Sequence, residues 1–326
     1  MVKCVFGPVP SRRLGQSLGI DTLPLKTCNW NCVYCQLGRT RPLVNQRSAF
    51  LDPEEVLSQV AVALEQHVPG EIDWVTFVGS GETTLDARLG EMISGVKSLT
   101  DLPVAVITNG SLLYLPEVRQ ELLPADAVLP SLDAGNPELY RKINRPHPDL
   151  TYERLVNGLI QFREAYQHRL WVEVMLVNGL NDSEEALKEI AAVLEEIKPD
   201  EVHIVQPTRP PVESWVKPPN EDALLRARAI LGKVATIIHP ALGGFDLSSE
   251  ENLIDAIIGI ITRHPMKESE LADALNAWTS TDIHETLEEL KKSGRAQIVE
   301  RQGVRFWSAS EAYYPNHNGA GTDPDG

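Results

Sequence analysis

Short runs of apolar and β-branched residues alternate with helix-forming segments along residues 51–240, and this alternation constrains the fold more than any other feature of the chain. The strand-forming runs, such as residues 72–79 (IDWVTFVG), are apolar along nearly their whole length. Strands of this kind are typical of parallel sheets covered by helices. With a first strand expected at residues 18–23, six strands can be counted, too few for a complete eight-unit barrel. The pattern predicts an α/β fold, built as an open partial barrel or as a doubly wound sheet.

The pattern changes after the sixth strand. A proline-dense segment at residues 206–219 (QPTRPPVESWVKPP) predicts an ordered loop, because proline cannot continue a helix. Three amphipathic helix patterns and a hairpin turning at Gln302-Gly303 follow further on, an order typical of a winged-helix domain. We therefore expect a barrel domain at 1–240, a linker at 241–249, a winged-helix-like domain at 250–310 and a disordered tail at 311–326.

Three of the four cysteines lie within eight positions, in the stretch CNWNCVYC at residues 28–35. Structural zinc needs four protein ligands, and only three thiols are clustered here. Three thiolates on a cubane [4Fe–4S] cluster would leave one iron open to an external ligand. Three alternatives remain open for the same thiols. They could bind structural zinc together with a distant fourth ligand, or an electron-transfer cluster with Cys4 as its remote fourth ligand. They could also form a redox disulfide switch.

The bulk properties of the chain argue against several classes of protein. No run of about eighteen apolar residues is present, so we expect no membrane-spanning segment. The first residues (MVKCVFGPVPSRR) contain no secretory signal, so we expect a cytoplasmic protein, in which clustered cysteines bind metal or react. The net charge of −16 opposes attraction to nucleic-acid phosphates and to anionic lipids.

The cysteine stretch, with Tyr34 before the third cysteine, resembles the cluster loop of the radical S-adenosylmethionine (SAM) superfamily. The resemblance implies a partial (β/α)6 TIM-type barrel and a [4Fe–4S] cluster held by Cys28, Cys32 and Cys35. It implies that SAM chelates the open iron through its amino and carboxylate groups, with the backbone of Tyr34 near the adenine. Reductive cleavage of SAM would then give methionine and a 5′-deoxyadenosyl radical that abstracts hydrogen from a substrate. An external one-electron donor, ferredoxin or flavodoxin, is also implied, because the sequence has no second cluster motif.

A second motif supports this resemblance. The stretch FVGSGETTL begins at Phe77, at the end of the second predicted strand, and resembles the Gly-Gly-Glu segment of the superfamily. Gly81 and Glu82 are the positions implied to hold the methionine amino group, because a glycine backbone approaches ligands closely and a carboxylate pairs with an ammonium. Ser80 and Thr83 depart from the usual pattern, which has glycine and often proline there.

Further candidates follow the later strands. Asn109 ends the third predicted strand, and Ser131 and Asp133 end the fourth, where barrel sites are built. By resemblance these three residues are expected to meet the ribose or the carboxylate of SAM, and Asn178 is expected near the adenine. For Asn109, Ser131 and Asp133 a turn-forming role is an equally open alternative, because Asn-Gly and Asp-Ala-Gly sequences favour turns.

The segments GPVPSRRLGQSLGID and PTRPP resemble one branch of radical SAM Fe–S oxidoreductases, distantly akin to tRNA wybutosine-synthesis enzymes. Substrate recognition is expected at the polar residues of these segments, namely Ser11, Arg12, Arg13 and Arg209. The substrate itself is left open among RNA, a peptide and a metabolite. An RNA substrate would require the arginines of the predicted loops to gather at the barrel mouth; these are Arg12, Arg13, Arg39, Arg41, Arg47 and Arg145.

A winged helix also suggests a competing hypothesis, a transcription regulator that senses iron or redox state through its cluster. Residues 250–310 hold seven Lys and Arg against eleven Asp and Glu. The expected recognition helix carries four acidic residues, Asp282, Glu285, Glu288 and Glu289. DNA contact needs clustered basic residues on that helix, so we expect no DNA binding. The domain is expected to pack on the barrel or to bind a protein or peptide.

Overall fold

The computed structural model describes residues 2–11, 13–239, 252–275 and 278–315. Eight strands form one sheet whose spatial order follows the chain order. The first pair is antiparallel and every later pair is parallel. A doubly wound sheet would reverse its order at one point, so the sheet follows the barrel-type alternative. The strands are β1 (Val5–Ser11), β2 (Gly15–Ile20), β3 (Trp74–Phe77), β4 (Val104–Ile107), β5 (Ala127–Leu129), β6 (Arg169–Met175), β7 (Glu201–Val205) and β8 (Ala235–Ile237).

The six predicted strands correspond to β2–β7, and the sheet has two further strands at its edges. The first predicted strand, 18–23, lies three residues too late, because β2 spans Gly15–Ile20. Pro8 and Pro10 obscure β1 in the sequence, yet proline is tolerated on an edge strand, where one side of the backbone needs no partner. β8 has only three residues, too few for a visible period.

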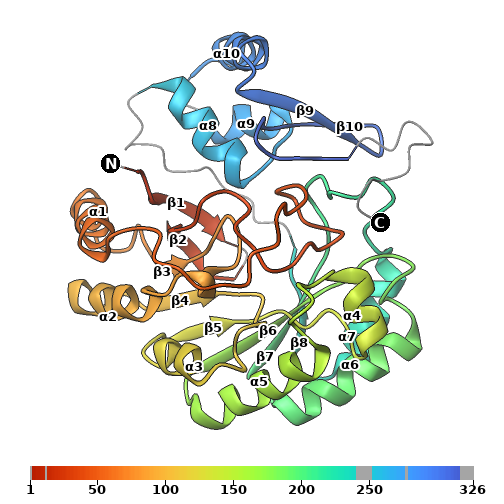
Figure 1. The fold of residues 1–326 in the computed structure, drawn as a ribbon. Helices are drawn as coiled ribbons and strands as arrows, with labels where there is room; N and C mark the ends of the chain where they lie inside the picture. The colour runs from red at the N-terminus through yellow and green to blue at the C-terminus, as the bar shows by residue number, and fades with distance from the viewer. Residues whose placement is uncertain (1, 12, 240–251, 276–277, 316–326) are drawn as a thin grey trace.

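Helices cover the outer face of this sheet (Figure 1). Several begin at a side chain that caps them: Asp52 accepts a hydrogen bond from the backbone N–H of Glu54, and Ser183 from that of Ala186. The helices are α1 (Pro53–Glu65), α2 (Leu89–Leu99), α3 (Pro116–Leu122), α4 (Pro137–Ile143), α5 (Tyr152–Ala165), α6 (Glu184–Ile197) and α7 (Glu221–Leu231).

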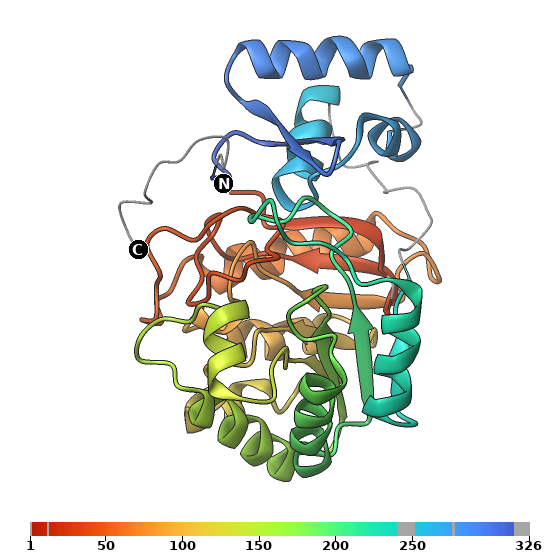
Figure 2. The same cartoon turned by 90° about the vertical axis from the view of Figure 1, so that its right-hand side faces the viewer.

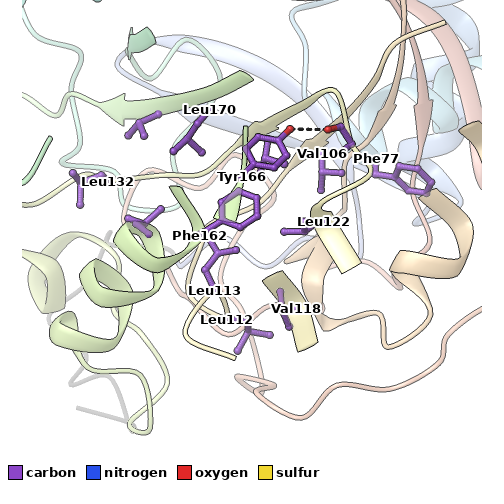
Figure 3. Packing of buried hydrophobic residues seen from close by; sticks show 14 of the residues in the cluster. Phe77, Val106, Leu112, Leu113, Val118, Leu122, Leu132, Phe162, Tyr166 and Leu170 are labelled. Carbon is purple, nitrogen blue, oxygen red and sulfur yellow. Dashed lines mark hydrogen bonds between the residues drawn. The ribbon is translucent and has the colours of Figure 1, made fainter. Parts of the chain in front are cut away.

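The two faces of the sheet have different cores. The outer core lies between the sheet and the helices, and Figure 3 shows a part of it in which the rings of Phe162 and Tyr166 stack at 4.6 Å. The inner core is smaller and includes Trp74 and Trp171, whose rings lie 5.8 Å apart. These tryptophans lie in the first half of their strands, so they fill the amino-terminal end of the interior. The carboxyl ends of the strands are left for polar loops, as in barrel sites generally.

The chain continues into a C-terminal module, defined here as the described residues from 252 to 315. It has its own apolar core, which includes Ile257, Leu271, Leu287 and Trp307. It lies beside β1 and the long loop after β2, as both views of the ribbon show (Figures 1 and 2). Its elements are α8 (Leu253–Arg263), α9 (Glu268–Ala274), α10 (Ser280–Lys292), β9 (Ala296–Arg301) and β10 (Val304–Ala309).

The module has the predicted order of three helices and a hairpin, and its identification as a winged helix stays a prediction. The predicted linker, 241–249, lies outside the described residues. The predicted disordered tail, 311–326, begins too early, because Ala312 and Tyr314 are buried. Residues 316–326 lie outside the described chain. No helix in the described ranges has both the length and the apolar character needed to cross a membrane.

Gly158 of α5 gives a test of this packing. A Cβ built there would lie 2.5 Å from the backbone nitrogen of Tyr114 and 2.7 Å from the carbonyl carbon of Leu113. Alanine is the better helix former by about 1 kcal/mol, but the neighbouring backbone cannot yield easily. We expect Gly158→Ala to lower the free energy of unfolding by about 2 kcal/mol in denaturant titrations. Its exposed neighbour supplies the control, Asn157→Ala, which should change it by less than about 0.5 kcal/mol. Equal stability of the two variants would contradict the packing.

Candidate functional site

A long loop between β2 and α1, residues 21–52, crosses the carboxyl end of the sheet and carries the three clustered cysteines, all partly exposed. Each sulfur has a different donor beside it. The backbone N–H of Trp30 lies 3.4 Å from Cys28 Sγ, Asn144 Nδ2 lies 3.6 Å from Cys32 Sγ, and Lys26 Nζ lies 3.0 Å from Cys35 Sγ. Hydrogen bonds to sulfur favour the thiolate that a metal requires.

Two of the three thiols are less acidic than a free cysteine. Burial raises the pKa of Cys28 to about 12, even though Lys26 lowers it. Burial also raises the pKa of Cys32, and the charges of Asp133 and of the other two cysteines raise it further. Reactive cysteines have lowered pKa values, whereas a buried thiol loses its proton when a metal coordinates it. Cys28 and Cys32 therefore suit metal ligands better than free nucleophiles.

The number of thiols, rather than their spacing, favours a cluster. The three cysteines lie in one electrostatic neighbourhood, since the charges of Cys28 and Cys35 both raise the pKa of Cys32. Among the described residues, no group of three or more His, Cys, Asp or Glu side chains, these cysteines included, is arranged to hold a metal ion. Structural zinc needs four protein ligands, whereas three thiolates can hold a [4Fe–4S] cluster with one iron open to an external ligand.

The second motif lies directly against this loop. The backbone N–H of Lys26 donates to the carbonyl of Ser80 (2.6 Å), and that of Glu82 donates to the carbonyl of Thr27 (2.9 Å). A Cβ on Gly81 would lie 1.8 Å from the carbonyl oxygen of Thr27. Only glycine permits this approach. The residue just before Cys28 therefore rests on the glycine-rich segment after β3.

Glu82 is buried and joins the ends of two strands. One carboxylate oxygen accepts hydrogen bonds from the backbone and hydroxyl of Thr84 and from the hydroxyl of Thr108, and the other accepts one from the backbone N–H of Asn109 (2.6 Å). Burial raises the pKa of Glu82, and these hydrogen bonds oppose the shift. Asn109 continues the connection, because its side-chain amide donates to Asn29 in the cysteine loop (2.8 Å).

Asp133 anchors the other side of the cysteine loop. Its carboxylate accepts hydrogen bonds from the hydroxyl of Tyr34 (2.5 Å), the side-chain amide of Asn144 (2.7 Å) and the backbone N–H of Met175 (2.9 Å). Ser131 forms a parallel bridge with Glu173 and thereby extends the pairing of β5 with β6. The hydrogen bond to Asp133 fixes the orientation of the Tyr34 side chain.

Asn178 is the predicted site residue that the described contacts connect least well. It is exposed, and its backbone N–H donates to the carbonyl of Lys217 (3.0 Å). Its neighbours Val177 and Leu180 do pack in one apolar cluster with Val33. The segment therefore borders the cysteine loop, while no described side-chain contact of Asn178 itself reaches it.

Several residues that hold the cysteine loop in place could not be recognised from the sequence as site residues. Asn29 is fully buried and donates to the hydroxyl of Ser111 (2.8 Å) as well as accepting from Asn109. Lys26 lies just ahead of the cysteine motif, and Asn144 lies in a polar segment at residues 140–148 (YRKINRPHP). Their position beside sulfur or beside Asp133 depends on tertiary contacts. The one local sign in the sequence is that Asn29 lies within the cysteine motif.

The backbone approach at Gly81 gives a prediction. We expect Gly81→Ala to separate the two loops, because the Thr27 carbonyl would have to move by more than 1 Å. Iron and sulfide bound after anaerobic reconstitution should fall severalfold. The matched control is Gly79→Ala, whose Cβ would meet the flexible side chain of Leu23, at 2.7 Å, rather than backbone. Gly79→Ala should retain most of the iron, and normal iron content in Gly81→Ala would contradict the predicted separation.

Comparisons with known proteins agree with this site. The family model described as the radical SAM superfamily matches residues 22–194. A UPF0026 protein of Methanocaldococcus jannaschii is 34% identical over 306 residues, covering 93% of this chain and 94% of that protein. A protein of Brachyspira hyodysenteriae named GTPase Obg is 38% identical over 315 residues, but the chain spans only 45% of its length.

The crystal structure of a radical SAM methyltransferase from Sphaerobacter thermophilus has the same fold. The TM-score is 0.52 at 18% sequence identity, covering 68% of this chain and 66% of that chain. At this identity the likeness concerns the fold alone, which is an α/β fold with a parallel sheet. The sequence matches go further: the chain belongs to the radical SAM superfamily, whose enzymes use a [4Fe–4S] cluster and S-adenosylmethionine, and to its UPF0026 proteins.

Proposed function

We propose that the chain binds a [4Fe–4S] cluster through Cys28, Cys32 and Cys35 and reductively cleaves SAM to methionine and a 5′-deoxyadenosyl radical, which abstracts hydrogen from a substrate. The observation that carries the proposal is the backbone contact between Thr27 and Gly81. It brings the cysteine loop and the glycine-rich segment to one point at the carboxyl end of the sheet.

We assign the residues around the sulfurs to setting the reduction potential of the cluster. Lys26 lies within hydrogen-bond distance of Cys35, and Asn144 donates to Cys32. Hydrogen bonds to sulfur ligands and nearby positive charge raise the reduction potential of a cluster. No second cluster motif is present in the sequence, so the electron is assigned to an external donor, ferredoxin or flavodoxin.

SAM is assigned to the segment from Gly79 to Glu82. Both carboxylate oxygens of Glu82 are already engaged by neighbours, so its first task is to hold the ends of β3 and β4 together. Its negative charge then attracts the methionine ammonium. We assign Asn109 and Ser131 to the ribose or carboxylate of SAM, and residues 177–180, with Asn178, to the adenine. Asp133 is assigned to orienting Tyr34, whose backbone borders the adenine.

The arginines proposed for RNA binding have partners within the chain. Arg13 pairs with Glu173, Arg39 and Arg145 pair with Glu213, and Arg47 pairs with Glu121. Arg41 lies over the ring of Tyr313, at 4.6 Å, and Arg12 lies outside the described residues. Arg13, Arg39, Arg47 and Arg145 share three glutamates, which lowers the net charge that they offer to phosphates and favours a peptide or a metabolite over RNA as substrate.

The transcription-regulator alternative is not favoured. The face of α10 that would enter a DNA groove exposes Asp282, Glu285 and Glu289. Such a face repels phosphates. The family comparisons point to an enzyme instead. The cytoplasmic location stays a prediction.

Anaerobic reconstitution tests the proposed reaction. Reconstituted protein with dithionite and SAM should release 5′-deoxyadenosine and methionine in equal amounts. Cys32→Ala should lose the cluster absorbance and the SAM cleavage together. The control is Cys4→Ala, because Cys4 is a buried cysteine that lies outside the cysteine motif, and it should keep both. Iron and sulfide near the wild-type level in Cys32→Ala, or no 5′-deoxyadenosine from the wild type, would refute the proposal.

The role of Glu82 has a separate test. In Glu82→Gln the amide nitrogen would face donors that now meet a carboxylate oxygen, at a cost of about 1–3 kcal/mol. We expect cluster content near the wild-type level and SAM affinity about tenfold weaker in equilibrium dialysis. Asp126→Asn is the control, because Asp126 also accepts a backbone N–H, from Val104, but at the amino-terminal edge of the sheet. Unchanged SAM affinity in Glu82→Gln would contradict the assignment of Glu82 to the methionine ammonium of SAM.

A further inference from the structure

Asp21 fixes the start of the glycine-rich segment. It follows β2 directly and is 5% exposed. One carboxylate oxygen accepts a hydrogen bond from the backbone N–H of Ser80 (3.0 Å), and the other accepts one from the Ser80 hydroxyl (2.6 Å). Ser80 precedes Gly81, so Asp21 helps to decide where Gly81 and Glu82 lie.

The cation beside Asp21 comes from the C-terminal module. Arg263, the last residue of α8, places its Nε 3.0 Å from the carboxylate oxygen of Asp21 that also accepts the Ser80 hydroxyl. The guanidinium lies 4.6 Å from the ring centre of Phe6 in β1, and only 20% of the Arg263 side chain is exposed. A buried carboxylate without its cation either takes up a proton or turns toward water. In both cases its hold on Ser80 weakens.

The same module holds the chain just after the third cysteine. The side-chain amide of Gln36 donates to the carbonyl of Arg263 (2.9 Å), and the hydroxyl of Tyr314 donates to the carbonyl of Gln36. The backbone N–H of Arg39 donates to the carbonyl of Tyr313 (2.7 Å). Gly38 has φ +81°, and a Cβ there would lie 2.6 Å from the Tyr313 carbonyl oxygen. The module thus contacts the cysteine loop directly and reaches the glycine-rich segment through Asp21.

We propose that the C-terminal module completes the SAM site, with Arg263 acting as a positioning residue that holds Ser80 and Gly81 in place through Asp21. This inference rests on the proposed assignment of residues 79–82 to SAM. Arg263 is assigned no contact of its own with SAM or the cluster. Its effect passes through one buried ion pair and two hydrogen bonds to Ser80.

The test uses the full-length, reconstituted protein carrying Arg263→Gln. We expect SAM affinity about tenfold weaker in anaerobic equilibrium dialysis, with iron and sulfide near the wild-type level. Amide hydrogen exchange of the peptide containing residues 79–82 should be faster without SAM present. Arg263→Lys keeps the charge and should recover part of both effects.

Glu270→Gln is the matched control. Glu270 of the module also forms an ion pair with the barrel, with Arg209, and its side chain is 38% exposed. It makes no described contact with Asp21 or Ser80. Its loss should leave SAM affinity and hydrogen exchange at residues 79–82 unchanged. An equal loss of affinity in both variants would mean general loosening of the module and would overturn the positioning role.

The remaining outcomes are equally decisive. Wild-type affinity and exchange in Arg263→Gln would refute the inference. If Arg263→Gln does not fold, a double-mutant cycle of Arg263→Lys and Asp21→Asn tests the coupling instead. Both substitutions alter the same ion pair, so the loss of SAM affinity in the double variant should be smaller than the sum of the two single losses. Full additivity would refute the coupling. If the wild type binds no SAM, the proposed function is wrong, and hydrogen exchange at residues 79–82 still tests whether Arg263 holds the segment.

Discussion

The close approach of two backbones, at Thr27 and Gly81, is the constraint on which the rest of the site depends. It joins a loop that follows β2 to a segment that follows β3, and a side chain on residue 81 would prevent it. Because β2 and β3 are parallel neighbours, both segments leave the sheet at the same edge. Glu82 and Asn109 extend this contact to β4, and Asp133 with Tyr34 extends it to β5. The cysteines are therefore held by the ends of four consecutive strands.

The interior of the sheet is divided along the strand direction. Tryptophans fill its amino-terminal end, where Trp74 and Trp171 pack together. Polar side chains begin to enter beyond them, where Ser17 and Thr76 share a hydrogen bond of 2.6 Å, although Ile107 and Leu129 at the ends of β4 and β5 still belong to the apolar inner core. The apolar end stabilises the sheet, and the polar end is free to carry chemistry. A buried carboxylate such as Glu82 finds its hydrogen-bond donors at this polar end, in the backbone and hydroxyl of Thr84, the hydroxyl of Thr108 and the backbone of Asn109.

Much of this organisation could be predicted from the sequence, because it is encoded locally. The six parallel strands are short apolar runs, and the two motifs are contiguous. The edge strand β1 was missed because its prolines usually exclude a strand, and β8 because it is too short. Asp21 and Asn144 act on Ser80 and Cys32, which lie far along the chain, so no local pattern reveals these contacts, and Asn29 is marked only by its place within the cysteine motif. Burial of Tyr314 was missed for the same reason, since its partner is Gln36.

The central claim is that the three thiols hold a cubane with one iron open to SAM. Electron–nuclear double resonance on the reduced, reconstituted protein tests it most directly, with SAM labelled by ¹⁵N in the amino group and ¹⁷O in the carboxylate. We expect hyperfine coupling of both labels to a [4Fe–4S]⁺ signal, together with a change of that signal when SAM is added. A cluster signal that SAM leaves unchanged, or a colourless protein containing only zinc, would contradict it.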